Sequence, residues 1–100
     1  MAQHMNLTLE IDLACRAAHQ ASLARPDGSY TWTGKKFFTH PHDLEQVWAD
    51  LELGESDTVT VVLEPTRNAW APLASWFRRR GATIALVPTT QSADLRAYYC

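Results

Sequence analysis

The sequence has little of what marks a disulfide-stapled, zinc-binding or membrane protein. Only two cysteines, Cys15 and Cys100, occur in 100 residues, and they lie far apart. They are too few for a disulfide framework, and no histidine stands at zinc-ligand spacing from a cysteine pair. No apolar run approaches the roughly 20 residues of a membrane helix, and residues 1–12 lack the features of a secretory signal. We therefore expect a cytoplasmic protein that does not enter a membrane.

Motifs that cradle nucleotides are also missing. The four glycines form neither a Walker loop nor a dinucleotide-binding loop. The hydrophobic share of 46% and the charged share of 20% are ordinary for a globular chain, and 100 residues allow one domain, so we expect one domain over 1–100. His40 and His42 are interpreted as helix-cap and surface residues.

Basic residues are few in the first two thirds of the chain, and acidic residues are few in the last third. Residues 1–66 hold ten acids and four bases, a balance of −6, whereas residues 67–100 hold five bases and one acid, a balance of +4. The net charge of −2 argues against a free-standing basic nucleic-acid binder. The division still allows an acidic site beside a basic flank, as a metal-dependent nuclease needs.

The first third of the chain predicts an antiparallel meander. Leucine and isoleucine alternate with polar residues over 7–13, which is typical of a strand with one apolar face. Two more strands are expected over 17–24 and 29–38, joined through Pro26-Asp27-Gly28. Proline fixes φ and glycine accepts a positive φ in such a turn.

Three helices and two strands follow. A helix is expected from Pro41, capped by Thr39 or His40 and stopped by Gly54. A strand begins at Thr58, a second helix runs from near Asn68 to Gly81, a strand covers 82–88, and a further helix covers 90–99. Aromatic side chains at helical spacing are more typical of core than of a base-stacking platform; they are Trp48, Trp70, Trp76 and Phe77.

The order β-β-β-α-β-α-β-α predicts an α/β fold with a ribonuclease-H-like mixed sheet flanked by helices. Crossover connections would make the strand from Thr58 parallel to the strand over 7–13 and able to pair with it. Asp12, near the end of the first strand, and Glu64, at the end of the fourth, would then be neighbours. Ligand sites in such sheets lie at the carboxyl ends of strands.

Two neighbouring carboxylates point to a divalent cation. Two anions a few ångströms apart raise each other's pKa unless a cation lies between them. Mg²⁺ prefers such oxygen ligands, and a pair of ions can clamp a phosphodiester. Two acids are few for that chemistry, and Glu10 lies two residues too early to be a third. The alternative is that each acid is simply solvated at a strand end.

Two segments of the sequence identify a candidate family more specifically than the hydrophobic periodicity does. The segments "LEIDLACRAAH" and "VVLEPTRNAWAPLASWFRRRGATIALVPTTQSADLRAYY" resemble the two blocks of the DEDD-type insertion-sequence transposases. The second block has a strand, Glu-x-Thr, an aromatic residue, Pro-Leu-Ala, a helix, Gly, and a strand ending in Val-Pro. Together the blocks cover almost the whole chain.

This resemblance implies a RuvC-like catalytic domain that uses Mg²⁺ to cleave and recombine DNA. Asp12 and Glu64 would be the first two acids of the family's catalytic, metal-binding tetrad. The family also implies a structured guide RNA and a homo-oligomer in the full-length protein. The other two acids, a pair of aspartates, follow the Tyr-Tyr region, and this sequence ends at Cys100 before them. We therefore expect a truncated transposase domain that does not cut DNA by itself.

Several positions depart from the family pattern. Glu10 and Arg67 stand where many members have glycine, and Cys15 stands where many have lysine. Thr66 either caps the second helix or belongs to a plain turn. Arg67 and the run Arg78, Arg79 and Arg80 are candidate nucleic-acid contacts, although a solvated helix end explains the run as well.

Two other kinds of function stay open from the sequence. A non-catalytic remnant could act as a protein-interaction module, or the chain could be an unrelated small domain with an apolar ligand pocket.

Overall fold

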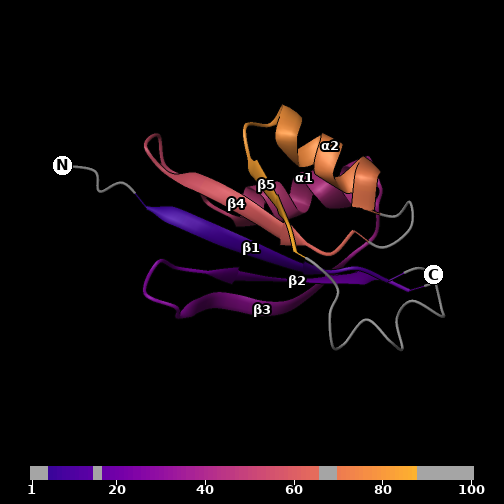
Figure 1. Cartoon of the computed structure of the whole chain (residues 1–100), viewed down its shortest axis with the longest axis horizontal. Coiled ribbons are helices and arrows are strands. Elements are labelled where there is room, and N and C mark those ends of the chain that lie inside the picture. Colours follow the sequence, from indigo (N-terminus) through magenta and orange to yellow (C-terminus); the bar gives the residue numbers. More distant parts are fainter. Residues whose placement is uncertain (1–4, 15–16, 66–69, 88–100) are drawn as a thin grey trace.

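The computed structural model describes residues 5–14, 17–65 and 70–87, which form a mixed α/β structure with five strands and two helices (Figure 1). In chain order the elements are β1 (Asn6–Asp12), β2 (His19–Ala24), β3 (Tyr30–Phe37), α1 (Pro41–Asp50), β4 (Thr58–Leu63), α2 (Trp70–Arg79) and β5 (Thr83–Leu86). Every element expected over these residues is present, with bounds that differ by up to two residues at most ends. The helix expected over 90–99 lies outside the described residues.

The five strands form one sheet in the order β3-β2-β1-β4-β5. The first three strands pair antiparallel, as the meander predicts. β1 pairs parallel with β4, and β4 pairs parallel with β5. The expectation that the fourth strand pairs parallel with the first is therefore confirmed.

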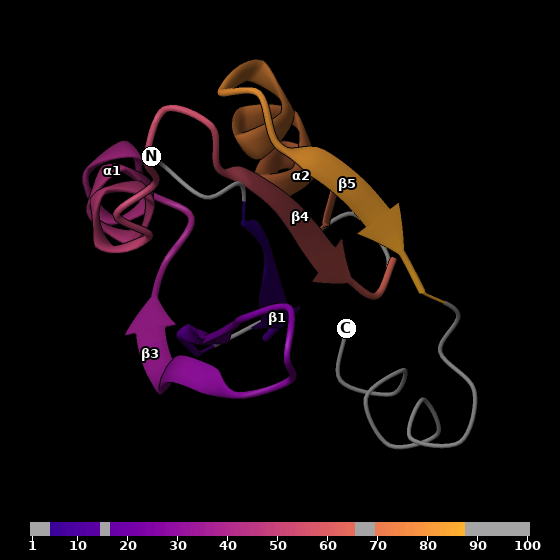
Figure 2. The ribbon, with the colours of Figure 1, turned by 90° about the vertical axis from the view of Figure 1, so that its left-hand side faces the viewer.

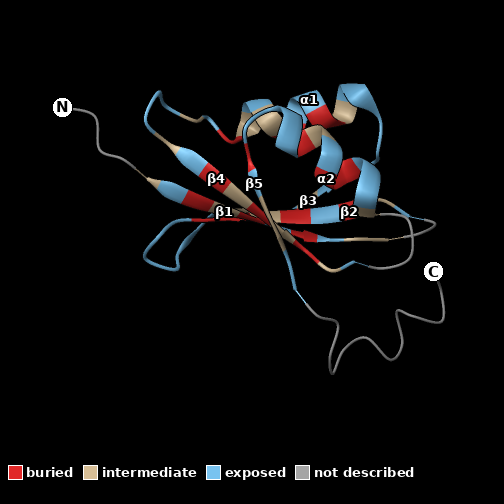
Figure 3. Cartoon of the chain, turned by 45° about the horizontal axis from the view of Figure 1, so that its top comes forward, coloured by how far each residue is buried: buried red, intermediate tan, exposed pale blue. Residues whose placement is uncertain are grey.

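Both helices pack on the same face of this sheet, and the core lies between the helices and the sheet (Figures 2 and 3). Alternate residues of each strand point into it, because side chains of a strand alternate between its faces. Leu9, Val61, Leu73 and Phe77 are completely buried. The other fully or almost fully buried large side chains are Leu23, Val47 and Leu63.

The turn between β2 and β3 uses the residues that the sequence predicts. Gly28 has φ +92°, and its N–H donates to the carbonyl of Arg25 over 2.9 Å. The Asp27 carboxylate accepts hydrogen bonds from both the hydroxyl and the backbone N–H of Ser29. These bonds lower the pKa of Asp27. The turn is therefore held by local hydrogen bonds rather than by burial.

The end of α1 differs from the prediction. The helix begins at Pro41 as expected, but the His40 side chain makes no capping hydrogen bond. The helix ends at Asp50, and Glu52, not Gly54, takes the left-handed conformation with φ 51°. The Gly54 N–H instead donates to the carboxylate of Asp57 over 2.8 Å. Gly54 is thus part of a turn before β4 rather than the stop of the helix.

An aromatic cluster joins α1 to α2. The rings of Trp76 and Phe77 meet edge to face with centroids 5.1 Å apart, and Trp48 lies 6.3 Å from Trp76. Trp70 is half-buried against the same core. These aromatic residues therefore belong to the packing between the layers, as the helical spacing indicates. Pro72 is the third residue of α2 and lies in its first turn, where a missing N–H is tolerated.

Within residues 5–14, 17–65 and 70–87, neither helix has the length and apolar character required to cross a bilayer.

Candidate metal centre

The face of the sheet opposite the helices is polar, and we call it the polar face. It consists of residues that are exposed or half-buried, namely Thr8, Glu10, Asp12, Gln20, Ser22, Thr58, Thr60 and Val62. β1 and β4 lie in the middle of this face, because they are the third and fourth strands of the sheet. The acids at their ends are therefore carried by central strands rather than by an edge.

The register of β1 and β4 relates Asp12 to Glu64. Glu10 pairs with Val62, so each acid lies two residues beyond the last pair of this ladder. Paired residues of neighbouring strands point to the same side, and the strands lie about 4.8 Å apart. Continued by two residues, the register aligns Asp12 with Glu64 on the polar face. Asp12 is the last residue of β1 and exposed, and Glu64 directly follows β4 and is half-buried.

The described part of the chain offers two carboxylates for a cation at this position, not three. Over residues 5–14, 17–65 and 70–87 no group of three or more His, Cys, Asp or Glu side chains is placed to hold a metal ion. Glu10 shares the polar face, but its carboxylate accepts a hydrogen bond of 2.9 Å from the hydroxyl of Tyr30. This bond raises the pKa of the Tyr30 phenol. Glu10 thus has a partner of its own on β3.

A buried histidine lies beside Asp12 and was not singled out from the sequence as a site residue. His19 is the first residue of β2 and the one polar residue of the described chain that is buried. Its Nδ1 accepts the backbone N–H of Ala14 over 3.0 Å, and its Nε2 lies 2.9 Å from the hydroxyl oxygen of Thr39. Because Nδ1 accepts a hydrogen bond, the neutral ring carries its proton on Nε2, and this N–H donates a hydrogen bond to the hydroxyl oxygen of Thr39.

Two opposed effects set the charge of His19. Burial lowers its pKa from the ordinary value of 6.5, and the negative charge of Asp12 raises it by a smaller amount. The ring also meets Phe37 edge to face, with centroids 5.3 Å apart. His19 is therefore held neutral in a partly apolar environment next to the first acid.

The arginines proposed to contact nucleic acid lie at the other end of the sheet. α2 ends at Arg79, just before β5 begins at Thr83, which pairs with Thr60 near the start of β4. Asp12 and Glu64 lie at the carboxyl ends of β1 and β4. The arginine run therefore flanks the amino ends of the parallel strands and is not brought together with the two acids. Arg67 and Thr66 lie outside the described residues.

The three arginines of the run differ in their contacts. The Arg80 guanidinium lies over the ring of Trp76, 4.4 Å from its centroid, and forms an ion pair with Glu45. It therefore joins α2 to α1. Arg78 and Arg79 are exposed at the helix end, where positive charge is favourable.

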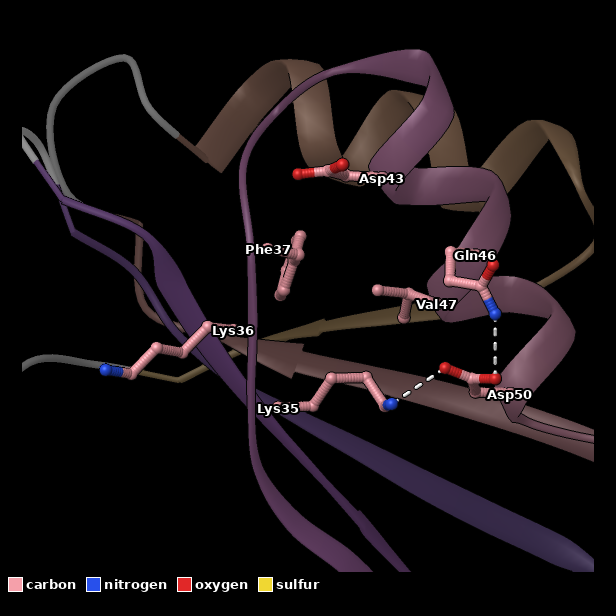
Figure 4. A pocket seen from close by; sticks show the side chains of 7 residues that line it. All are labelled: Lys35, Lys36, Phe37, Asp43, Gln46, Val47 and Asp50. Atoms are coloured by element: carbon pink, nitrogen blue, oxygen red, sulfur yellow. Dashed lines mark hydrogen bonds and ion pairs between the residues drawn. The ribbon is translucent and has the colours of Figure 1, made fainter.

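A small surface pocket lies between β3 and α1 (Figure 4). Five polar or charged residues and two apolar ones line it, namely Lys35, Lys36, Phe37, Asp43, Gln46, Val47 and Asp50. Asp50 pairs with Lys35 over 2.7 Å and accepts a hydrogen bond from Gln46 over 3.0 Å. These bonds lower the pKa of Asp50, and the bond with Lys35 has the larger effect. The pocket is thus not the apolar cavity that a small-ligand domain would require.

Sequence reasoning missed His19 and Tyr30 because their roles depend on how the strands pair, and each has a side-chain partner 20 positions away. The alternation of His19, Ala21 and Leu23 on one face of β2 was the available signal for His19. For Tyr30, the signal was the hairpin register through Gly28, which brings β3 beside β2 and toward β1.

No protein-family model matches the chain, and the comparison with curated proteins gives no significant match.

Proposed function

We propose that the chain is part of a RuvC-like, Mg²⁺-dependent DNA transposase, with Asp12 and Glu64 as catalytic metal ligands. The observation that carries the proposal is the parallel register of β1 and β4. Continued two residues past its last pair, Glu10 and Val62, this register would bring together the two acids that the family resemblance selects, although 51 residues lie between them in the sequence. Strand alternation assigns Asp12 to the polar face, away from the helices, and its continuation past Leu63 would assign Glu64 to the same face.

The strand order supports the ribonuclease-H-like part of the proposal. Three antiparallel strands followed by two parallel ones, in the order β3-β2-β1-β4-β5, are what such a sheet requires. The two acids then lie at the carboxyl ends of adjacent central strands, where ligands of open α/β sheets bind.

The residues present fit a hard divalent cation. Mg²⁺ is commonly held by one or two carboxylates together with water and substrate phosphates, and Asp12 and Glu64 supply two. When bound, the ion would offset their charge and polarise a phosphodiester. The carboxylates would position the ion through their oxygens, and the rigid central strands would keep those oxygens in place. Cleavage by two metal ions needs further acids, so these 100 residues are not expected to cut DNA alone.

DNA as a partner follows from the same proposal, and the described residues limit where it is contacted. Arg78 and Arg79 are exposed, whereas Arg80 is engaged with Trp76 and Glu45. We therefore restrict the proposed DNA contacts of the arginine run to Arg78 and Arg79. A guide RNA and a homo-oligomer of the full-length protein are implied by the resemblance and are part of the same proposal.

Metal binding tests this function directly. We expect Mn²⁺, a paramagnetic substitute for Mg²⁺, to broaden the backbone amide signals of residues next to Asp12 and Glu64 in the NMR spectrum of the purified chain. Asp12→Asn and Glu64→Gln keep side-chain size but remove the charge, and each should weaken the broadening at both strands. Glu10→Gln is the matched control on the same face, and it should leave the broadening in place.

Two outcomes would count against the proposal. If the signals of the wild-type chain do not broaden, the proposed metal site is contradicted, and the protein-interaction alternative is favoured. Broadening that survives Asp12→Asn and Glu64→Gln, in variants whose amide spectra show a folded protein, would place the cation elsewhere.

A further inference from the structure

We propose that His19 is a positioning residue for the metal site, because its imidazole fixes the main chain that follows Asp12. This inference rests on the proposed function. It starts from a polar side chain that is 6% exposed and packs against the buried ring of Phe37. Burying an imidazole is unfavourable unless its nitrogens are hydrogen-bonded, and both nitrogens of His19 have partners.

The first partner lies next to the proposed ligand. The antiparallel ladder between β1 and β2 ends where Asp12 pairs with Gln20. Ala14 is two residues farther along and outside the strand, and its N–H donates to Nδ1 of His19. The side chain of His19 on β2 thus holds the backbone that follows β1, beyond the last pair of the ladder between β1 and β2.

The second partner ties this bond to the rest of the fold. Thr39 belongs to the connection between β3 and α1, and its hydroxyl oxygen accepts a hydrogen bond from the Nε2–H of His19. Phe37, at the end of β3, is 3% exposed and packs against the imidazole. His19 therefore connects the end of β1 to the end of β3 through a ring whose tautomer and orientation are both fixed.

A carboxylate ligand needs such support. Binding geometry is lost when a ligand is displaced by about 0.5 Å, and residues behind a ligand commonly change metal affinity by 10–100-fold. Asp12 is exposed and ends its strand, so the backbone on its far side must be held by something other than the ladder. The bond between His19 and Ala14 does this.

Two substitutions at His19 separate this role from a general contribution to folding. Asparagine carries its amide oxygen near the place of Nδ1, so His19→Asn can still accept the Ala14 N–H. Glutamine carries its amide nitrogen near the place of Nε2, so His19→Gln can still reach Thr39 but leaves the Ala14 N–H without its acceptor. Thr39→Val removes only the outer bond and provides a further variant.

Mn²⁺ titrations of these variants, followed by amide broadening near Asp12, test the inference. The measurement is made near pH 7.5, where an imidazole of lowered pKa is neutral. We expect His19→Gln to weaken Mn²⁺ binding about tenfold and His19→Asn to restore most of the affinity. Hydrogen exchange of the Ala14 amide gives a readout without metal, and it should be faster in His19→Gln than in His19→Asn.

The outcomes distinguish this inference from the proposed function. Wild-type affinity in a folded His19→Gln variant would overturn the inference and leave the metal site intact. Equal losses of affinity in the Asn and Gln variants, in proportion to their losses of stability, would reduce His19 to a structural role. Absence of Mn²⁺ binding at Asp12 in the wild-type chain would overturn both proposals.

Discussion

Val61 and Val62 are neighbours on β4, yet they belong to regions with different physical roles. Val61 is completely buried under the helices, whereas Val62 is half-buried on the polar face and pairs with Glu10. Apolar residues occupy the helix-covered face because burial of aliphatic groups stabilises the fold. The polar face contributes less to the core and can carry carboxylates. One strand therefore serves stability on one side and the candidate chemistry on the other.

The difference between the two faces of β4 can be tested by placing the same negative charge on each face. We expect Val61→Asp to destabilise the protein by on the order of 4 kcal/mol or more, because it buries an unpaired carboxylate. Val62→Asp should cost much less, about 1 kcal/mol, since its side chain can reach water. Urea denaturation followed by circular dichroism measures both. Similar losses would show that the two faces are equally packed.

A change of pH should affect the helix-covered face through His19. Its folded-state pKa is lowered, so below the ordinary pKa of 6.5 the unfolded chain binds the proton more readily than the folded chain does. The contribution of His19 is thus complete above that pH and is lost as the pH falls from there toward the folded-state pKa. Removing its bond to Ala14 should cost about 1–2 kcal/mol near neutral pH.

Wild type and His19→Gln compared between about pH 5 and 8 would show this difference. The stability advantage of the wild type should shrink on acidification. A constant advantage across the range would mean that the imidazole does not resist protonation in the folded protein.

The smallest expected effect on stability concerns two neighbouring arginines at the end of α2. Arg80→Ala removes the contact with Trp76 and Glu45 and should cost about 1 kcal/mol, because both interactions are partly exposed to solvent. Arg79→Ala, one residue earlier, should change stability by no more than about 0.5 kcal/mol. Thermal unfolding of the two variants provides the measurement. Equal effects would remove the assigned role of Arg80 between the helices.

The sequence predicted the parts of the fold that depend on local patterns. Alternation over 7–13 identified β1 and its apolar face, and the chain order predicted the parallel pairing that relates Asp12 to Glu64. It did not predict that Glu52 rather than Gly54 adopts the left-handed conformation, because the packing of α1 sets where that helix stops. The contacts of His19 with Thr39 and of Arg80 with Glu45 join residues 20 and 35 positions apart. Such pairs depend on how the layers pack, which no local pattern contains.

The short turn around Gly28 offers a practical route to these measurements. It is exposed and closes on itself through the bonds of Asp27 and Ser29. It also lies at the amino end of β1, since Ala24 pairs with Thr8 there, and so at the opposite end of that strand from Asp12 (Figure 1). A fluorophore or affinity tag attached at this tip could report on or immobilise the protein at a distance from the proposed metal site.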